Sequence, residues 1–218
     1  MRVEEAKWIN SFLKTMDINA LSPMLDLGSS TKEFREVTMP HIYNYIFRYL
    51  ENEGVEVIHF DQKKAPGVDM HGDFFESGVS RALQEKRFRF ILCANMLEHV
   101  DDPKALIEKC LNLLSSGGLL LLTVPYSYPY HPDTIDSMFR PGPDQLAELV
   151  PSANLIHKST IVSNSLLSDV IQNPVIGLKL MVRLCLPFLG FKKWVSALHR
   201  LTWLFRPYKI TAAVFVKQ

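Results

Sequence analysis

Polar side chains stand directly after apolar segments at several places in the first half of the chain. Asp26 comes just before a turn at Gly28, Asp61 ends a β-branched segment, and Asp73 and Asn95 follow two later segments. Carboxylate oxygens accept hydrogen bonds from hydroxyl and amino groups, and glycine lets the backbone come close to a ligand. If the fold brings these residues together, they can form a binding site for a small polar molecule.

The segment 126–140 gathers a second set of reactive side chains between several prolines. Its members are Tyr126, Tyr128, Tyr130, His131, Asp133, Asp136 and Arg140. Such a loop is typical of a substrate site, and His131 is our candidate for a general base that Asp133 or Asp136 orients. Two other interpretations stay open. One is a metal site made by the same three side chains, which lacks an evident fourth ligand; the other is a loop packed on itself without chemistry.

Glu98 and His99 are neighbours just ahead of a predicted helix. An acid beside a histidine can serve in catalysis, but in a turn that leads into a helix the pair more commonly has a structural role. We therefore expect His99 to form a local hydrogen bond there.

Short apolar strands alternate with helices along most of the chain. We expect strands near 23–28, 55–60, 67–73, 88–93, 119–124, 154–162 and 210–216, and helices near 4–14, 40–53, 75–85, 102–114 and from 142. Strands that are apolar on both faces predict a largely parallel sheet between two helical layers. Right-handed crossovers then place the strand exits at one edge, where ligands bind. The predicted fold is a three-layer α/β sandwich with a doubly wound sheet.

Composition excludes several classes of protein. The chain has 218 residues, 47% hydrophobic and 22% charged, with a formal net charge of +1. These values are typical of a globular protein, and no apolar segment is long enough to cross a bilayer. Three widely spaced cysteines and a charged N-terminal segment argue against a disulfide framework, a zinc site and a signal peptide. We expect a cytoplasmic, single-domain protein over 1–218, with its core at about 20–163 and 208–218.

Four segments, in order, resemble the class I S-adenosylmethionine-dependent methyltransferases. They are MLDLGSS at 24–30, VEVIHFD at 55–61, GD at 72–73, and FRFILCANMLEHVDDPKALIEKCLNLLSSGGLLLLTVP at 88–125. The last is similar to the family's fourth strand, following helix and fifth strand, and the phrases MLEHV and GGLLLLTVP are especially typical. The resemblance covers about residues 20–165 and the last strand, and it implies a Rossmann-like methyltransferase fold.

The resemblance also implies a cofactor, S-adenosylmethionine, and a role for each candidate ligand residue. Asp26 would face the ammonium group of the cofactor, and Asp61 would accept hydrogen bonds from both ribose hydroxyls. Asp73 would accept a hydrogen bond from the adenine amino group. Asn95 and its neighbour Met96 would lie on the sulfonium side.

The turn after the first strand, Gly28-Ser29-Ser30, departs from the family's pattern, because Ser30 stands where the family usually has its second glycine. Serine fits there only with a negative φ or with some strain. Its hydroxyl would replace a water at the cofactor's carboxylate; alternatively, the site has lost affinity.

Two classes of function follow from these observations. The first is methyl transfer to a small-molecule acceptor or to a lipid- or sugar-linked one. The second is a methyltransferase-like protein that binds a cofactor or partner without catalysis, which the serine in the turn motivates. A nicotinamide-dependent dehydrogenase is disfavoured, because the turn lacks the spacing G-x-G-x-x-G.

Charge divides the chain into two parts. After Asp169 there are eight basic residues and no acidic one, so residues 1–169 hold 16 basic and 23 acidic residues, a net charge of −7. The basic part includes an insertion before the last strand, at about 164–207. Nucleic acid is disfavoured as a partner, since the acidic body would repel a duplex.

The insertion contains two predicted helices. Residues 175–186 are apolar around the full turn except for Lys179 and Arg183. Residues 191–206 form an amphipathic helix with an apolar arc and a basic side, and Trp203 falls on the basic side. One interpretation is a helical lid or homodimer surface, with the apolar arc buried. The other is reversible attachment of 178–206 to an anionic membrane surface.

Overall fold

A mixed β-sheet runs through the centre of the molecule. The computed structural model describes residues 1–130, 135–186 and 190–218. Within these residues, seven strands take the order β3-β2-β1-β4-β5-β7-β6. Their bounds are Met24–Leu27 (β1), Val57–Asp61 (β2), Met70–His71 (β3), Phe88–Ala94 (β4), Leu114–Ser127 (β5), Ala153–Val162 (β6) and Lys209–Lys217 (β7). Strands β3, β2, β1, β4 and β5 pair in parallel, and β7 is antiparallel to both β5 and β6.

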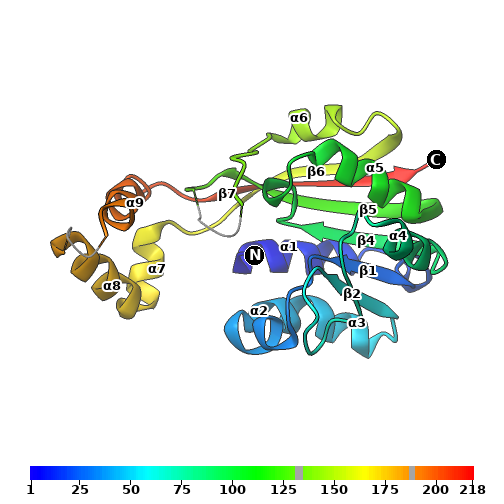
Figure 1. Cartoon of the computed structure of the whole chain (residues 1–218), viewed down its shortest axis with the longest axis horizontal. Helices are drawn as coiled ribbons and strands as arrows, with labels where there is room; N and C mark the ends of the chain where they lie inside the picture. The colour runs from blue at the N-terminus through cyan, green and yellow to red at the C-terminus, as the bar shows by residue number, and fades with distance from the viewer. Residues whose placement is uncertain (131–134, 187–189) are drawn as a thin grey trace.

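Two layers of helices cover the sheet (Figure 1). One layer packs α4 (Ser77–Gln84), α5 (Pro103–Leu113) and α6 (Pro143–Glu148) on one face, and the other packs α1 (Val3–Leu13), α2 (Pro40–Ile42) and α3 (Arg48–Asn52) on the opposite face. Short 3-10 and π-helical turns lie at Ile18–Ala20 (η1), Phe34–Thr38 (η2), Tyr43–Phe47 (η3) and Leu97–His99 (η4). This three-layer arrangement confirms the predicted fold class.

The central strands are apolar on both sides because both sides are buried. Along β4, Ile91 and Cys93 pack in the core under α5, while Phe90 and Leu92 pack in the core under α1. Successive side chains of a strand point to opposite faces, so one continuous apolar segment supplies both cores. Leu120 and Leu121 of β5 do the same. This double burial is why the sequence reads as an unbroken apolar run at these strands.

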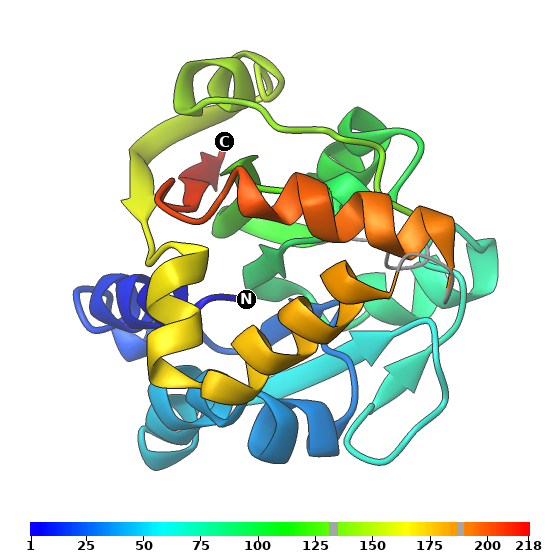
Figure 2. The ribbon, with the colours of Figure 1, turned by 90° about the vertical axis from the view of Figure 1, so that its left-hand side faces the viewer.

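The described part of the insertion between β6 and β7 forms three helices at the carboxyl edge of the sheet. They are α7 (Leu166–Gln172), α8 (Pro174–Cys185) and α9 (Phe191–Leu201). Figure 1 shows them beyond one end of the sheet, and Figure 2, turned to face that end, shows α8 and α9 in front of it. Among the described residues, no helix is both long enough and apolar enough to span a bilayer.

One detail of the predicted amphipathic helix is wrong. The helix ends at Leu201, so Trp203 lies beyond it and not on its basic side. Trp203 is instead buried, and it packs with Leu166 and with Tyr208, whose ring is stacked on the indole at 5.7 Å between centroids. This small apolar cluster stabilises the packing of the insertion against the start of β7.

Candidate active site

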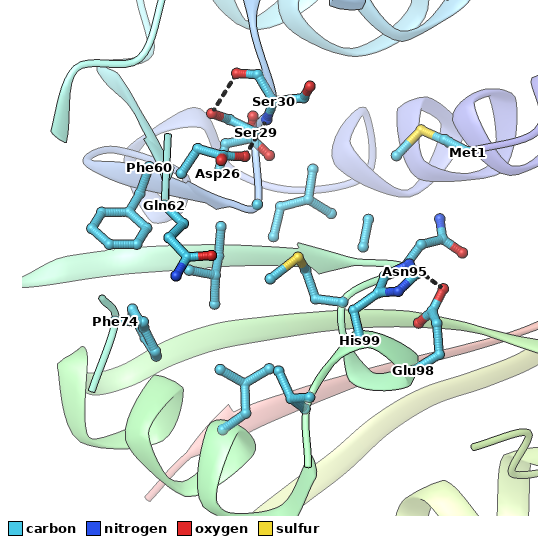
Figure 3. Close-up of a pocket in the computed structure, with 18 of the residues that line it drawn as sticks. Met1, Asp26, Ser29, Ser30, Phe60, Gln62, Phe74, Asn95, Glu98 and His99 are labelled. Atoms are coloured by element: carbon cyan, nitrogen blue, oxygen red, sulfur yellow. Dashed lines mark hydrogen bonds and ion pairs between the residues drawn. The ribbon is translucent and has the colours of Figure 1, made fainter. Parts of the chain in front are cut away.

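A cavity of about 1200 Å³ opens at the carboxyl edge of the parallel strands. The structure gathers around it most of the residues that the sequence singles out. From the first group these are Asp26, Gly28, Ser29, Ser30, Asp61, Asp73, Asn95 and Met96, and from the later loop Tyr128. Figure 3 shows Phe60, Gln62 and Phe74 at one side of the cavity and Glu98, His99 and Met1 at the other. The cavity therefore has two ends with different chemistry.

The turn after β1 is held by a carboxylate from the next strand. Gly28 has a φ of +78° and Ser30 a φ of +55°, so both lie in the left-handed region. The Ser30 N–H donates a 2.8 Å hydrogen bond to Asp61 Oδ2, while Oδ1 accepts one from the Lys63 N–H at 3.0 Å. Asp61 thus shapes the turn, and its remaining lone pairs stay available to a ligand. The positive φ strains the backbone of Ser30, because residues with a Cβ atom disfavour the left-handed region.

Arg35 is a positioning residue that the sequence analysis missed. Its buried guanidinium donates to the carbonyls of Ser29 and Ser30 at 3.0 and 2.9 Å, and to the carbonyl of Gly67 at 2.7 Å. Burial lowers the pKa of Arg35 below its ordinary value, against the opposing effect of nearby carboxylates such as Asp26. A single arginine in a helical segment carries no signal in sequence, since its contacts become visible only after folding.

Replacing the strained serine tests how the turn is built. We expect Ser30→Gly to raise the free energy of unfolding by about 0.5–1 kcal/mol, because relief of the strain exceeds the entropy that glycine adds to the unfolded chain. Chemical denaturation measures the change. Ser29→Gly is the matched control and should be destabilising, since Ser29 is absent from the described residues with positive φ. If both variants lose stability equally, Ser30 is not strained.

Asp26 is already engaged within the protein. Its Oδ2 lies 2.8 Å from Nδ1 of His59, on the neighbouring strand β2. His59 is held in turn by Phe47, whose ring meets it edge-on at 4.8 Å between centroids. The predicted contact of Asp26 with a ligand ammonium therefore depends on its other carboxylate oxygen.

The N-terminal helix reaches into the site through a buried glutamate. Glu5 of α1 is fully buried, and its Oε1 accepts hydrogen bonds from Asn95 Nδ2 at 2.7 Å and from Thr123 Oγ1 at 2.6 Å. Its Oε2 accepts one from the Arg2 N–H at 3.1 Å. Asn95, with a φ of +54°, is thereby fixed at the exit of β4. The sequence could not show this link, because 90 residues separate Glu5 from Asn95.

Glu98 and His99 occupy the end of the cavity away from Phe60 and Phe74 (Figure 3). Glu98 is fully buried, and neither carboxylate oxygen has a hydrogen-bond partner among the described residues. Its Oε1 lies 3.7 Å from His99 Nε2, and His99 Nδ1 donates to the carbonyl of Ile135. Burial raises the pKa of Glu98 to about 8, which outweighs the lowering effect of Arg140. The backbone N–H of His99 makes the expected local hydrogen bond, to the Met96 carbonyl at 3.0 Å, whereas its ring bonds to a residue 36 positions further on. A helix turn does not require a buried carboxyl that accepts no hydrogen bond.

The loop after β5 is only partly described. Tyr128 lines the cavity and is half-buried, whereas Tyr126 and Tyr130 are exposed and are not among its described lining residues. Arg140 Nη2 donates to Asp136 Oδ2 at 2.7 Å, and both side chains are largely or fully buried. His131 and Asp133 lie outside the described residues. Their roles, including the alternative metal site, stay predictions; the described residues alone contain no group of three metal-binding side chains.

Comparison with protein families shows the family to which the chain belongs. A family model described as a methyltransferase domain matches residues 2–157, most of the chain. The chain belongs to the methyltransferase domain family. The match includes the strand exits described above and agrees with the resemblance in the four sequence segments.

Curated relatives of this methyltransferase match over a shorter segment. A ubiquinone biosynthesis O-methyltransferase from Xanthomonas campestris pv. campestris (strain B100) is 33% identical over 85 residues. That alignment covers 39% of this chain and 34% of the relative. The chain therefore matches about a third of the relative's length.

Solved structures match the methyltransferase over nearly its whole length. A putative sarcosine dimethylglycine methyltransferase from Galdieria sulphuraria aligns with a TM-score of 0.55 and 15% identity, covering 98% of this chain and 85% of that one. A coclaurine N-methyltransferase bound to N-methylheliamine and SAH aligns with a TM-score of 0.53 and 13% identity, covering 96% and 72%. Because the sequence identity is low, these matches bear on the fold alone, and they confirm the Rossmann-like methyltransferase fold.

Proposed function

We propose that this methyltransferase transfers the methyl group of S-adenosylmethionine to a hydroxyl group of a small-molecule acceptor, or of a lipid- or sugar-linked one. The name of the O-methyltransferase relative supports an oxygen acceptor, and the SAH bound to the structural neighbour supports S-adenosylmethionine as the methyl donor. The observation that carries the proposal is the Glu98–His99 pair at one end of the cavity, because a hydroxyl acceptor needs a group that takes its proton.

The residues of the other end fit the cofactor. At Gly28 a Cβ atom would lie 2.1 Å from Met96 Sδ, so only glycine lets Met96 pack this closely against the turn where both residues line the cavity. Asp61 and Asp73 bring two carboxylates to the exits of β2 and β3, where ribose hydroxyls and an adenine amino group can donate to them. Phe60 and Phe74, 5.6 Å apart between ring centroids, supply an apolar wall beside them.

The volume of the cavity leaves room for an acceptor. A single-ligand site usually measures about 300–1000 Å³, and this cavity is larger, at about 1200 Å³. If adenosine bound beside Phe60, Asn95 and His99 would line the opposite part of the cavity, where methyl transfer would take place. The acceptor then approaches from the end near Met1 and Tyr128, both of which line the cavity.

The chain's own residues then handle one proton. Because the Ile135 carbonyl can only accept, His99 Nδ1 carries the hydrogen, and in the neutral ring the lone pair is on Nε2. During methyl transfer, Nε2 would take the proton of the acceptor hydroxyl as that oxygen is methylated. When bound, the cofactor supplies an activated sulfonium electrophile, so alignment and this proton transfer are what the protein adds. Ionised Glu98, 3.7 Å from Nε2, stabilises the imidazolium that forms.

Two histidine variants distinguish the possible bases. We expect His99→Ala to lower kcat by about 10²- to 10⁴-fold and to leave the affinity for S-adenosylmethionine nearly unchanged. The assay measures methyl groups transferred from the labelled cofactor to a panel of phenols and sugar alcohols, free and lipid-linked. His131→Ala should keep most of its activity. A loss of about a hundredfold in His131→Ala alone would instead assign the base to His131, as the sequence predicts.

A further inference from the structure

From the surface of the insertion we infer that α8 and α9 dock this protein onto an anionic lipid bilayer. The outer surface is defined by the exposed apolar residues of these helices together with the basic residues beside them. Its described members are Val175, Leu178, Lys179, Met181, Val182, Arg183, Val195, Leu198, Arg200 and Leu201. The inference concerns where the protein is held, and it does not depend on the identity of the acceptor.

Helix α8 has two apolar faces, and only one is used inside the protein. Ile176 and Leu180 pack against the cluster of Leu166, Trp203 and Tyr208. Leu178 and Met181 are 62% and 65% exposed, and no described residue of α8 is fully buried. A helix that only capped the sheet would place polar side chains on its solvent side.

The exposed apolar residues of α8 form one continuous arc. At about 100° per residue, Met181, Cys185, Leu178, Val182 and Val175 follow one another over about 120° of the helix. Lys179 and Arg183 come next around the circumference, at the edge of this arc. An apolar arc with a cationic border is the arrangement of a helix that lies in the plane of a membrane surface.

Helix α9 extends the same surface. Contacts between α8 and α9 hold them together, and Trp194 Nε1 of α9 donates a 3.0 Å hydrogen bond to the Leu184 carbonyl of α8. Val195 and Leu198 are exposed, and Phe205 just after the helix is 78% exposed. In Figure 2 both helices face the viewer, in front of the sheet's carboxyl edge. The lid hypothesis expected the apolar arc of this helix to be buried, and for these residues the structure shows the opposite.

Charge identifies the occupant of this surface as an anionic one. No acidic residue occurs from 170 to 218, and the acid that comes just before, Asp169, is paired with Arg2 at 2.6 and 3.0 Å. A second copy of the chain would bring two cationic borders together, which is unfavourable. An anionic bilayer matches both the cationic border and the apolar arc. Residues 1–169 carry a net charge of −7, so an anionic bilayer would repel them and they would face away from its surface.

Vesicle sedimentation tests the inference. The full-length protein should pellet with vesicles of phosphatidylcholine and phosphatidylglycerol at low salt. It should remain in the supernatant with phosphatidylcholine alone, and binding to the mixed vesicles should weaken at high salt. Replacing Lys179 and Arg183 by glutamine should weaken binding by about fivefold for each cation removed. Leu178→Ser with Met181→Ser should weaken it by tenfold or more, from the lost burial of two apolar side chains.

Matched variants elsewhere control for charge and exposure. Lys64→Gln with Lys86→Gln removes two exposed lysines from the body, and Val37→Ser replaces an apolar residue that is 72% exposed there. Both should bind vesicles like the wild type. Equal pelleting with both lipids, or equal binding by all variants, overturns the inference. Light scattering that finds a dimer which Leu178→Ser with Met181→Ser dissociates also overturns it, in favour of a homodimer surface.

Discussion

Glu98→Gln is expected to make the protein more stable and the enzyme slower. The buried carboxyl has a pKa of about 8 in the folded state against an ordinary value of 4.5. The folded state therefore holds a proton that the unfolded state releases above pH 4.5, and stability falls as the pH rises from 4.5 toward 8. At pH 7 this costs about 3 kcal/mol, at about 1.4 kcal/mol for each pH unit. Glutamine has the shape of the protonated acid and no charge to lose, so it should recover most of that free energy.

The pH dependence separates this prediction from an ordinary stabilising substitution. Wild-type stability should be greatest below pH 4.5, as far as Glu98 is concerned, and should level off above pH 8. The difference between wild type and Glu98→Gln should grow across the same range. Urea denaturation at a series of pH values measures it. A constant difference at all pH values would mean that Glu98 is ionised in the folded protein.

Activity should change in the opposite direction. Ionised Glu98 stabilises protonated His99, so wild-type kcat should rise with pH through about 8, and Glu98→Gln should lose that rise together with about a hundredfold of kcat. Glu98→Asp is the conservative variant and should keep a pH-dependent rate. Glu108→Gln, on the helix that follows, is a control that removes one carboxylate outside the cavity's described lining. If Glu98→Gln turns over at the wild-type rate, the acid is structural.

Asp61→Ala should weaken S-adenosylmethionine binding by about 10- to 150-fold. The substitution removes a charged acceptor for the ribose hydroxyls, which is worth about 1.5–3 kcal/mol, and it also releases the Ser30 N–H from its 2.8 Å hydrogen bond. Calorimetric titration with the cofactor and with its demethylated product gives both affinities. The loss should appear for both ligands, because both carry the same ribose.

Asp69→Ala is a matched control for this titration. Asp69 is an exposed acid near the same strands, and its Oδ2 also accepts one backbone N–H, that of His59 at 2.8 Å. It does not belong to the described lining of the cavity. Wild-type affinity in this variant would attribute the effect to the position of Asp61 and not to charge. Equal affinity of Asp61→Ala and wild type would contradict the assignment of Asp61 to the cofactor. No binding by the wild type at millimolar cofactor would favour a non-catalytic role for the protein.

Much of the fold could be predicted because burial leaves a periodic mark on the sequence. The segment 119–124 is apolar on both faces, and it lies in the middle of the sheet with a core on each side. Asp61 could be predicted as a site residue because it ends such a strand at the ligand-binding edge. The position of Trp203 could not, since helical periodicity continues past Leu201 although the helix does not.

The missed site residues have a common property, which is dependence on distant partners. Glu5 acts through Asn95, and Arg35 acts through the Gly67 carbonyl. Glu98 differs, because the sequence shows its position beside His99 but does not show its burial. A solvated glutamate has an ordinary pKa, and only the packing of elements that are far apart in sequence shows that this one has lost its water.

The position of β7 has a consequence for how the chain folds during synthesis. This strand lies between β5 and β6, yet its residues follow both of them and the whole insertion. At about 5–20 residues per second, a ribosome needs several seconds to make the insertion after β6 is complete. During that interval β5 and β6 each present an unpaired edge, which is the feature of a sheet most prone to aggregation. Nascent chains should therefore be most dependent on chaperones just before Lys209–Lys217 emerge and join the two halves of the sheet.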